Sequence, residues 1–362
     1  MTNTFEYAFP SIRGVQAGRE YYVSMCPLKL IPKIFLFNET ELPPEVRAQR
    51  ILNKSRVPAI AKYLLDNSDS YVFSALTASI DCQVQFEPYG DGGETNRLGV
   101  LRIPMTAKFI INDGQHRRAA IEIALRDNPA LGDETIAIVF FLDYGLERCQ
   151  QMFADLNRYA VRPSTSISIL YDHRDDLAKS IRLIILKSPL FKEVVEMEKT
   201  TLSLRSKELF TLSAIFTSSK ELVKNFGESE LENLSEIIET FWRVLPQYFP
   251  EWVKVKERKI TAGQVREQYI HSHGVVLQAL GRLGNTLLQT NRHEWERGLR
   301  GLSQIDWKRS NAKLWEGRAL IGGKVSKSVN NVILTGNVIK QELKIPLRPD
   351  EEKVEKEFCR GK

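Results

Sequence analysis

The stretch that decides the fold of the first half of the chain is residues 107–126, AKFIINDGQHRRAAIEIALR. An apolar run at 109–111 predicts a strand, and the alanine-rich residues from 119 onward predict a helix. Between the two, Asp113 is a good helix cap, and Gly114 allows close approach to the backbone. Because the first amides of a helix have no partner within it, this corner is predicted to hold an anion such as phosphate.

The side chains of the corner predict a nucleotide site. Arg117 offers a planar fork of donors and His116 a switchable donor, so with Gln115 and the backbone amides they could hold a di- or triphosphate. Asp113 could instead approach a divalent metal such as Mg²⁺ bound to those phosphates. In the structural alternative, Asp113 only caps the helix and Arg117 makes a surface ion pair. The residues alone leave that alternative slightly ahead.

The motif Asp113-Gly114-Gln115-His116-Arg117 resembles the signature of the DGQHR-domain family, which includes the DndB regulators of DNA phosphorothioate modification genes in bacteria. Residues 152–157 (MFADLN) and 306–317 extend this resemblance over most of the chain. The resemblance implies a repressor that occupies the promoter of a DNA phosphorothioation gene cluster, with ATP as its ligand. It also implies that slow ATP hydrolysis is possible, and it places the nucleotide interpretation of the corner ahead of the structural one.

A second group of candidate nucleotide-binding residues, Asp155, Asn157 and Arg158, lies near the end of a helix predicted over 146–157. These side chains would face the same phosphates if the helix packs over the central strand, a placement that the family resemblance supports. In the structural alternative, the asparagine ends the helix and the arginine complements its negative dipole end. The two interpretations have equal weight.

The order of predicted elements indicates an α+β protein. Short apolar runs at 12–15, 21–25 and 34–37 predict strands, and the run at 135–142 predicts a buried one. The succession of strand, DGQHR turn, helix and strand is similar to the ParB/sulfiredoxin superfamily, in which such a turn holds nucleotide phosphates; this is an analogy of fold. We expect a ParB/sulfiredoxin-like domain at 1–163, a helical DNA-binding or regulatory domain at 164–347 and a mobile tail at 348–362.

A basic run in the second half is the candidate DNA-binding surface. Residues 292–327 contain nine Lys or Arg residues and four acidic residues, which gives a local charge of +5. The nine are Arg292, Arg297, Arg300, Lys308, Arg309, Lys313, Arg318, Lys324 and Lys327. They could follow a DNA backbone through phosphate contacts, although a solvated helix face is the usual meaning of such a run. The interleaved Trp295, Trp307 and Trp315 are predicted to be core residues.

Two further polar clusters are less convincing as sites. Residues 171–176 hold three carboxylates and a histidine, but consecutive helical positions point in different directions, so a solvated turn with a capping Asp is favoured. His271 and His273 do not share a helix face and are not expected to bind a metal together. No metal site is predicted.

Composition sets the remaining limits. The 362 residues are 43% hydrophobic and 27% charged, as in ordinary globular proteins, and the net charge of +6 suits nucleic acid only if it is clustered. The four cysteines form no metal or disulfide pattern, and no apolar run could cross a bilayer, so we expect a cytoplasmic protein. Motifs of serine hydrolases, zincins and P-loop proteins are absent from the sequence.

Double-stranded promoter DNA is the expected partner, with other modification-system proteins and a second copy of the chain as further possibilities. The competing function is a metal-dependent NTPase or DNA nickase within a modification or restriction system, using carboxylates such as Asp113, Asp155, Asp172 and Asp175. A third is a scaffold that binds modification enzymes without touching DNA. The sequence shows no clear helix-turn-helix to read DNA.

Overall fold

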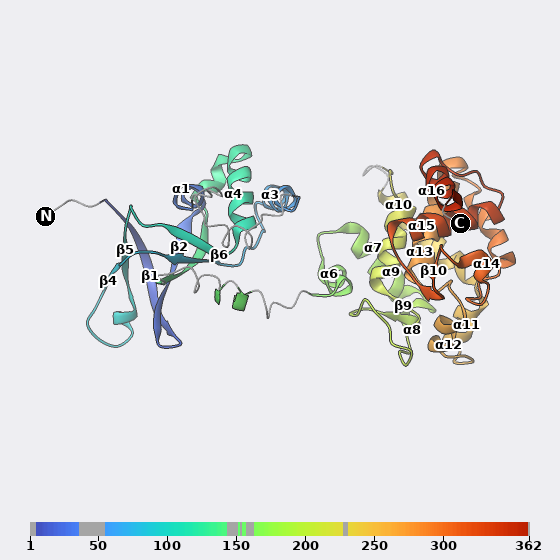
Figure 1. The fold of residues 1–362 in the computed structure, drawn as a ribbon, viewed down its shortest axis with the longest axis horizontal. Helices are drawn as coiled ribbons and strands as arrows, with labels where there is room; N and C mark the ends of the chain where they lie inside the picture. Colours follow the sequence, from blue (N-terminus) through green and yellow to red (C-terminus); the bar gives the residue numbers. More distant parts are fainter. Residues whose placement is uncertain are drawn as a thin grey trace. The chain divides into compact units, whose positions relative to one another are not determined.

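The computed structural model describes residues 5–35, 55–142, 151–152, 154–156, 163–226 and 231–360. Contacts divide the chain into two compact units, Met1–Val161 and Arg162–Lys362, which are described separately below. The first contains a mixed seven-stranded sheet with helices and the second is mainly helical, so the expected α+β class is confirmed (Figure 1).

The sheet of the first unit has the strand order β4-β5-β1-β2-β7-β3-β6. All neighbouring strands are antiparallel except β3 and β7, which are parallel. The strands are β1 (Glu6–Gln16), β2 (Arg19–Pro27), β3 (Leu76–Ile80), β4 (Gln85–Pro88), β5 (Leu98–Pro104), β6 (Phe109–Asp113) and β7 (Thr135–Leu142). Strand β3 lies between β7 and the edge strand β6, and all five of its residues are buried.

Three helices lie together on one side of this sheet, α1 (Ile31–Ile34), α3 (Val57–Asp66) and α4 (Gln115–Asp127) (Figure 1). Ile121 and Ala124 of α4 share a buried core with the β3 residues Leu76, Ala78 and Ile80. The strand predicted at 34–37 is wrong for its first two residues. Residues 31–34 form helix α1, which has a proline in its first turn, and residue 35 follows it as a bend. Residues 36–37 lie outside the described residues.

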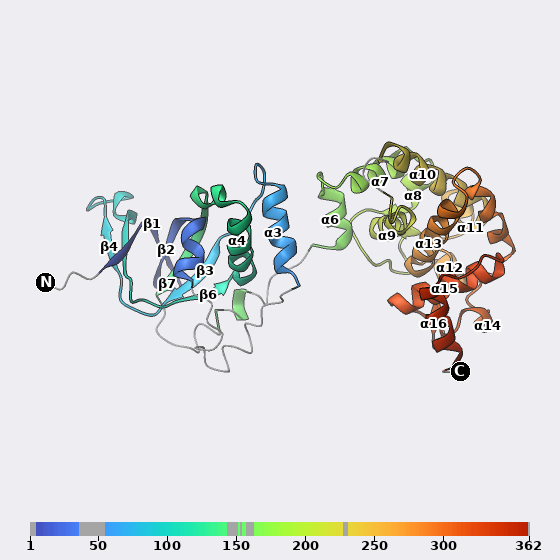
Figure 2. The ribbon, with the colours of Figure 1, turned by 90° about the horizontal axis from the view of Figure 1, so that it is seen from above.

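The second unit is built around α13 (Gly274–Thr290), which is buried along most of its length against α9 (Leu212–Leu222) and α15 (Val329–Glu342) (Figure 2). Its other elements are α6 (Thr165–Tyr171), α7 (Asp176–Lys187), α8 (Phe191–Val194), β8 (Val195–Glu196), β9 (Phe210–Thr211), α10 (Leu231–Val244), α11 (Pro250–Lys256), α12 (Ala262–Gln268), the 3-10 helix η6 (Trp295–Gln304), α14 (Ala312–Trp315), β10 (Leu320–Ile321), β11 (Lys324–Val325) and α16 (Pro349–Arg360). Trp295, Trp307 and Trp315 are buried, as predicted.

The structure bears on two further predictions, which concern the cysteines and membrane-spanning segments. Cys26, Cys82 and Cys359 are free thiols, while Cys149 lies outside the described part of the chain. No helix within the described ranges is long and apolar enough to cross a membrane.

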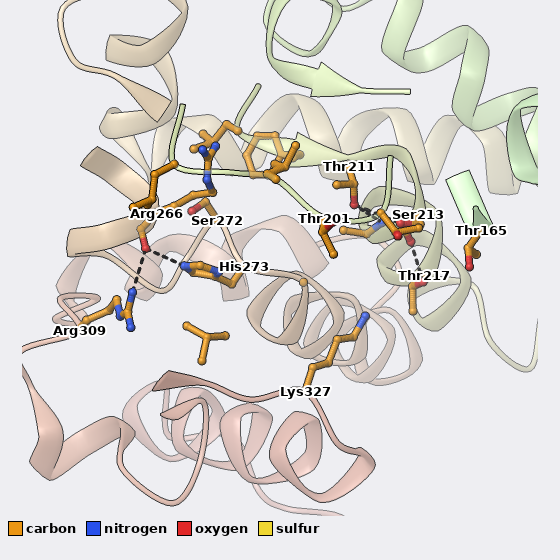
Figure 3. Close-up of a pocket in the computed structure, with 18 residues that line it drawn as sticks. Thr165, Thr201, Thr211, Ser213, Thr217, Arg266, Ser272, His273, Arg309 and Lys327 are labelled. Carbon is orange, nitrogen blue, oxygen red and sulfur yellow. Dashed lines mark hydrogen bonds between the residues drawn. The ribbon is translucent and has the colours of Figure 1, made fainter. Parts of the chain in front are cut away.

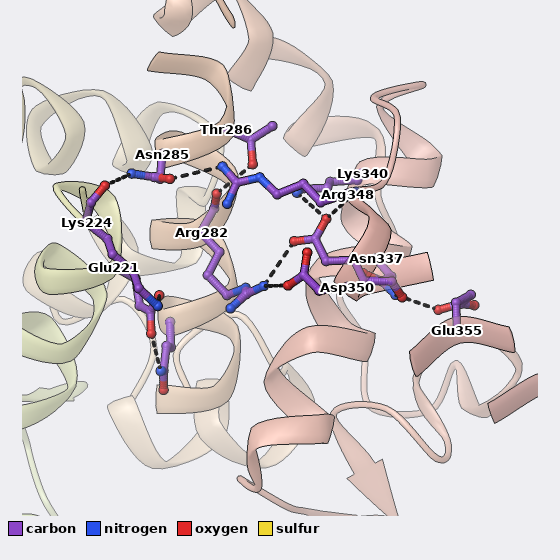
Figure 4. A network of polar contacts seen from close by, with 12 residues as sticks. Glu221, Lys224, Arg282, Asn285, Thr286, Asn337, Lys340, Arg348, Asp350 and Glu355 are labelled. Atoms are coloured by element: carbon purple, nitrogen blue, oxygen red, sulfur yellow. Dashed lines mark hydrogen bonds and ion pairs between the residues drawn. The ribbon is translucent and has the colours of Figure 1, made fainter. Parts of the chain in front are cut away.

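The C-terminal helix α16 differs from the mobile tail expected at 348–362. Its Glu351 is buried and accepts hydrogen bonds from Lys340 Nζ at 2.6 Å, Arg282 Nη2 at 3.1 Å and the Arg348 amide at 3.0 Å. Asn337 of α15 donates to the backbone of Glu351 at 3.0 Å and to Glu355 at 2.9 Å (Figure 4). The sequence of this segment is rich in charged residues, and for that reason it was predicted to be a mobile tail. Its partners lie on α13 and α15, and their proximity to the segment cannot be predicted from local sequence.

Candidate functional site

The DGQHR corner forms where β6 passes into α4. Asp113 ends β6, where it pairs with Thr77, and Gly114 stands at the N-cap of α4 with φ of +104°. The expected capping role of Asp113 is therefore wrong, because the strand extends through Asp113 and the helix begins one residue later. No side chain caps α4, so its first amides have no acceptor from the N-cap residue.

Only glycine fits at position 114. The positive φ is a conformation that residues with a Cβ rarely adopt. A Cβ built there would overlap the Leu76 side chain and would lie 3.0 Å from Arg117 Nη2. Gly114 thus lets the guanidinium of Arg117 lie against the turn.

Arg117 is held between the turn and α3. Its Nη2 donates to Asp113 Oδ2 at 2.7 Å, and its side chain is 17% exposed, against 48% for Asp113. Its Nε is buried and has no hydrogen-bond partner among the described residues. In a surface ion pair, water would hydrate the guanidinium nitrogens that the carboxylate does not bind. Here the Arg117 Nε is buried without an acceptor among the described residues, which normally costs free energy.

Arg117 also lines a cavity of about 540 Å³ against α3. Arg56, at the N-cap of α3, is a second cation on its wall, and Tyr63 and Phe73 supply aromatic rings whose centroids are 6.2 Å apart. The volume lies within the range of small-molecule sites. The cavity therefore combines two guanidinium groups with apolar surface, a combination that suits a nucleotide.

The other two side chains of the motif have different environments. Burial, together with the nearby Arg56 cation, lowers the pKa of His116, although the Asp113 carboxylate partly opposes this shift. His116 is therefore a neutral hydrogen-bonding group near pH 7 rather than a cation. The Gln115 amide donates back to the Ile111 carbonyl at 3.4 Å, so this side chain folds onto β6.

Sequence reasoning missed Asn112. A β-bulge at this point of the β3–β6 ladder sets Asp113 opposite Thr77 while Ile111 pairs with Ala78. Asn112 Nδ2 donates to Ser79 Oγ at 2.7 Å and contacts Met152 Sδ at 3.0 Å, and its buried Oδ1 has no partner among the described residues. A bulge depends on pairing between distant strands, so no local signal could have revealed this residue.

Asp155 does not line the Arg117 cavity. It accepts a hydrogen bond from Gln151 at 2.8 Å and lines another cavity, of about 440 Å³, with Arg19 and Leu142. The register explains this separation: Leu142 of β7 pairs with Ile80 at one end of β3, and Asp113 pairs with Thr77 near its other end. Asn157 and Arg158 lie outside the described residues.

In the second unit, the Arg318 side chain is buried, so the expectation that it is a surface cation facing DNA is wrong. Its guanidinium donates to both carboxylate oxygens of Glu355, at 3.0 and 2.5 Å, and to the Leu334 carbonyl at 3.0 Å. Such a bidentate pair joins α16 to the loop before β10. Counting charges along the sequence could not show which way this side chain points.

The other eight basic residues have varied surroundings. Arg300, Lys308, Lys313 and Lys324 are exposed. Arg297 pairs with Glu294, and the Arg292 guanidinium lies over the Phe226 ring, 5.7 Å from its centroid. Arg309 and Lys327 line a further cavity of this unit. Six of the nine predicted residues are therefore exposed and lie outside this cavity, and they remain possible phosphate contacts.

The remaining polar candidates have structural partners. Asp172 accepts hydrogen bonds from the amides of Arg174 and Asp175, and Asp175 caps α7 through the Ala178 amide at 2.9 Å. His271 is buried and accepts a hydrogen bond from Trp252 Nε1 at 2.9 Å. Within the described ranges, no group of three or more His, Cys, Asp or Glu residues is arranged to hold a metal ion.

Comparison with known proteins adds one finding. Residues 9–346, nearly the whole chain, match the family model DndB, described as DNA-sulfur modification-associated. No curated protein and no solved structure matches the chain significantly. The ParB/sulfiredoxin-like character of the first unit thus stays a prediction.

Proposed function

The chain belongs to the DndB family of DNA-sulfur modification-associated proteins, and from this premise we propose that it is a DNA-binding repressor of a bacterial DNA phosphorothioate modification gene cluster. ATP bound at the DGQHR corner would modulate its affinity for DNA. The observation that carries the nucleotide part is the unpartnered Nε of Arg117, buried beside the uncapped start of α4 and a cavity with a second arginine.

In this proposal, the corner holds the phosphates and the cavity holds the base. Arg117 keeps one nitrogen on Asp113 and donates its free Nε to a phosphate oxygen, while Arg56 adds a second positive charge. The first amides of α4 complete the phosphate site. Asp113, which is about half exposed, is the group that would approach Mg²⁺ carried by the phosphates.

DNA contacts are assigned to the exposed part of the basic run. Arg292, Arg297, Arg300, Lys308, Lys313 and Lys324 would neutralise backbone phosphates, which gives affinity without reading the sequence. If ATP favours one state of the protein and promoter DNA another, each ligand weakens binding of the other by the same factor.

Calorimetry of ATP binding tests the corner. Removing one hydrogen bond that involves a charged group costs about 1.5–3 kcal/mol, so Arg117→Ala should weaken ATP binding by roughly 10- to 150-fold. Arg126→Ala is the matched control, because Arg126 lies on the same helix, is 71% exposed and pairs with Glu122. Equal ATP affinities for wild type and Arg117→Ala, with both proteins folded, would remove the corner from the site.

A mobility-shift titration tests the DNA part. The protein should prefer duplex from its own upstream region over random duplex at physiological salt, and affinity should fall steeply as salt rises. Lys308→Ala/Lys313→Ala should reduce the salt slope by roughly one for each of the two lysines that neutralises a phosphate. Lys356→Ala, an exposed lysine of α16 outside the basic run, should leave the slope unchanged. Absence of any preference for upstream DNA would contradict the repressor function.

The competing NTPase or nickase function has no specific observation in its favour. Asp113 pairs with Arg117, Asp155 with Gln151, and the Asp172 and Asp175 carboxylates hold backbone amides. These four carboxylates are divided between the two units, and each has a partner that explains its position.

A further inference from the structure

The cavity lined by Arg309 and Lys327 lies wholly within the second unit and has a volume of about 650 Å³ (Figure 3). It forms where the first turns of α9 and α13 meet residues 200–204 and the strand β11. Hydroxyl groups from Thr201, Ser213 and Thr217 line it, together with apolar groups such as Phe210. No Asp or Glu is among the described residues of its wall, so its charge is positive.

The start of α13 opens into this cavity. His273 is the N-cap of this 17-residue helix, and its side chain makes no capping hydrogen bond. A Cβ built on Gly274 would lie 3.4 Å from Lys327 Nζ, so the ammonium group sits beside the first turn. The Lys327 side chain has no hydrogen bond or ion pair with any described residue, and although the residue is exposed, partial burial of its amine lowers the pKa of Lys327. A cation beside unpaired helix amides is a favourable place for an anion.

Ser272 supplies an independent observation. The residue is 4% exposed, lines the cavity, and its Oγ has no hydrogen-bond partner among the described residues (Figure 3). Leaving a buried hydroxyl unpaired normally costs free energy. A ligand oxygen in the cavity would accept this hydrogen bond.

The charges of the side chains around Ser272 determine the charge that a ligand in this cavity would carry. His273 Nε2 faces the Arg266 carbonyl at 2.8 Å and must therefore donate, and burial lowers the pKa of His273 to about 4, so the ring is neutral. Arg309 donates to the carbonyls of Gly323 at 2.8 Å and Arg266 at 3.4 Å, which fixes its guanidinium at the wall. The cations of the cavity are thus Lys327 and Arg309, with the buried Arg266 engaged by backbone carbonyls behind them.

We propose that this cavity is a second phosphate site, which binds a phosphomonoester of nucleotide size. Lys327, the first amides of α13 and the Ser272 hydroxyl would hold the phosphate, and Phe210 with the adjoining leucines would contact the organic part. The volume matches a small molecule or the end of a DNA strand and is too small for a duplex. The site is separate from the DGQHR corner, which belongs to the other unit.

Calorimetry on the full chain with AMP, inorganic phosphate, and short single strands carrying either a 5′-phosphate or a 5′-hydroxyl tests this inference. Lys327→Ala should weaken phosphomonoester binding at least about tenfold. Lys220→Ala is the control, since Lys220 is an exposed residue on the last turn of α9. Tighter binding of AMP than of the strand identifies a free nucleotide, and the reverse identifies a strand end.

Arg117→Ala distinguishes this proposal from the corner site. The second site should bind AMP equally in wild type and Arg117→Ala, whereas Lys327→Ala should lose that binding. If Lys327→Ala binds every probe as wild type does, or wild type binds none at millimolar concentration, the inference is overturned.

Ser272→Ala adds a readout that a purely structural serine would not give. Because its hydroxyl is unpaired, the alanine variant should unfold at the same or a higher temperature without ligand, yet gain less thermal stability from AMP than wild type does. Loss of stability without ligand, together with unchanged AMP binding, would show a structural role and contradict the assignment of Ser272.

Discussion

Replacing Glu351 with glutamine should strongly destabilise the second unit. Its carboxylate is 2% exposed and accepts hydrogen bonds from Lys340 Nζ, Arg282 Nη2 and the Arg348 amide. Lys340 is equally buried, at 1% side-chain exposure. Glutamine keeps the shape of the side chain but leaves the buried Lys340 ammonium group without its counter-charge.

The expected magnitude follows from this burial. Removing one partner of a buried ion pair costs about 3–5 kcal/mol, because the other charge remains desolvated. For a unit of this size, each kcal/mol lowers the melting temperature by roughly 2–4 °C, so a decrease of roughly 6–20 °C is expected. Glu352→Gln, one residue away, removes an exposed pair with Lys356 and should cost no more than about 1 kcal/mol.

Thermal and urea unfolding of both variants measure these differences. Lys340→Met in the Glu351→Gln background removes the orphaned charge and should restore at least about 2 kcal/mol of the unfolding free energy. A loss below about 1 kcal/mol for Glu351→Gln, or no recovery in the double variant, would refute the reasoning that the pair is buried and mutually required.

The same pair predicts a pH dependence. Burial raises the pKa of Glu351, but hydrogen bonds from the Arg348 amide and Lys340 outweigh it, and the net pKa is lowered. A lowered carboxyl pKa contributes stability above the unfolded value, about 4.3, and this stability is lost as the pH falls through the folded value. The difference between wild type and Glu351→Gln should therefore shrink below about pH 4.

Three further substitutions test other parts of the structure. Gly114→Ala should lower the unfolding free energy of the first unit by about 1–3 kcal/mol, since it forces a Cβ onto a φ of +104° and against Leu76; an unchanged melting curve would contradict the geometry of the turn. Arg318→Ala should cost about 3 kcal/mol by urea unfolding and Lys313→Ala less than about 0.5, because only the former leaves the partly buried Glu355 carboxylate without its counter-charge; equal losses would argue against a buried Arg318. Burial lowers the pKa of His273 to about 4, against about 6.5 in the unfolded chain, so the wild type should lose about 3 kcal/mol of stability as pH falls between these values, and His273→Gln should lose less; parallel pH profiles would rule out this shift.

Local patterns of apolar residues in the sequence were sufficient to predict several helices and strands. The apolar run at 135–142 is β7, and the alanine-rich residues after the DGQHR motif are α4. The three tryptophans of the basic run are buried. Their burial could be predicted, since large apolar side chains at helical spacing normally belong to the core. The family itself could be identified from five contiguous residues, since a motif is a property of the chain alone.

Long-range packing decided the sites. The bulge that carries Asp113 to the end of β6 depends on pairing with β3, and the register of β7 places Asp155 on another cavity. Arg318 was predicted as a surface cation, but Glu355 draws it inward from α16. Strand and helix periods are encoded by neighbouring residues, so they could be inferred from the sequence. Which groups meet in space depends on contacts between residues far apart in the chain, and only the tertiary structure determines those.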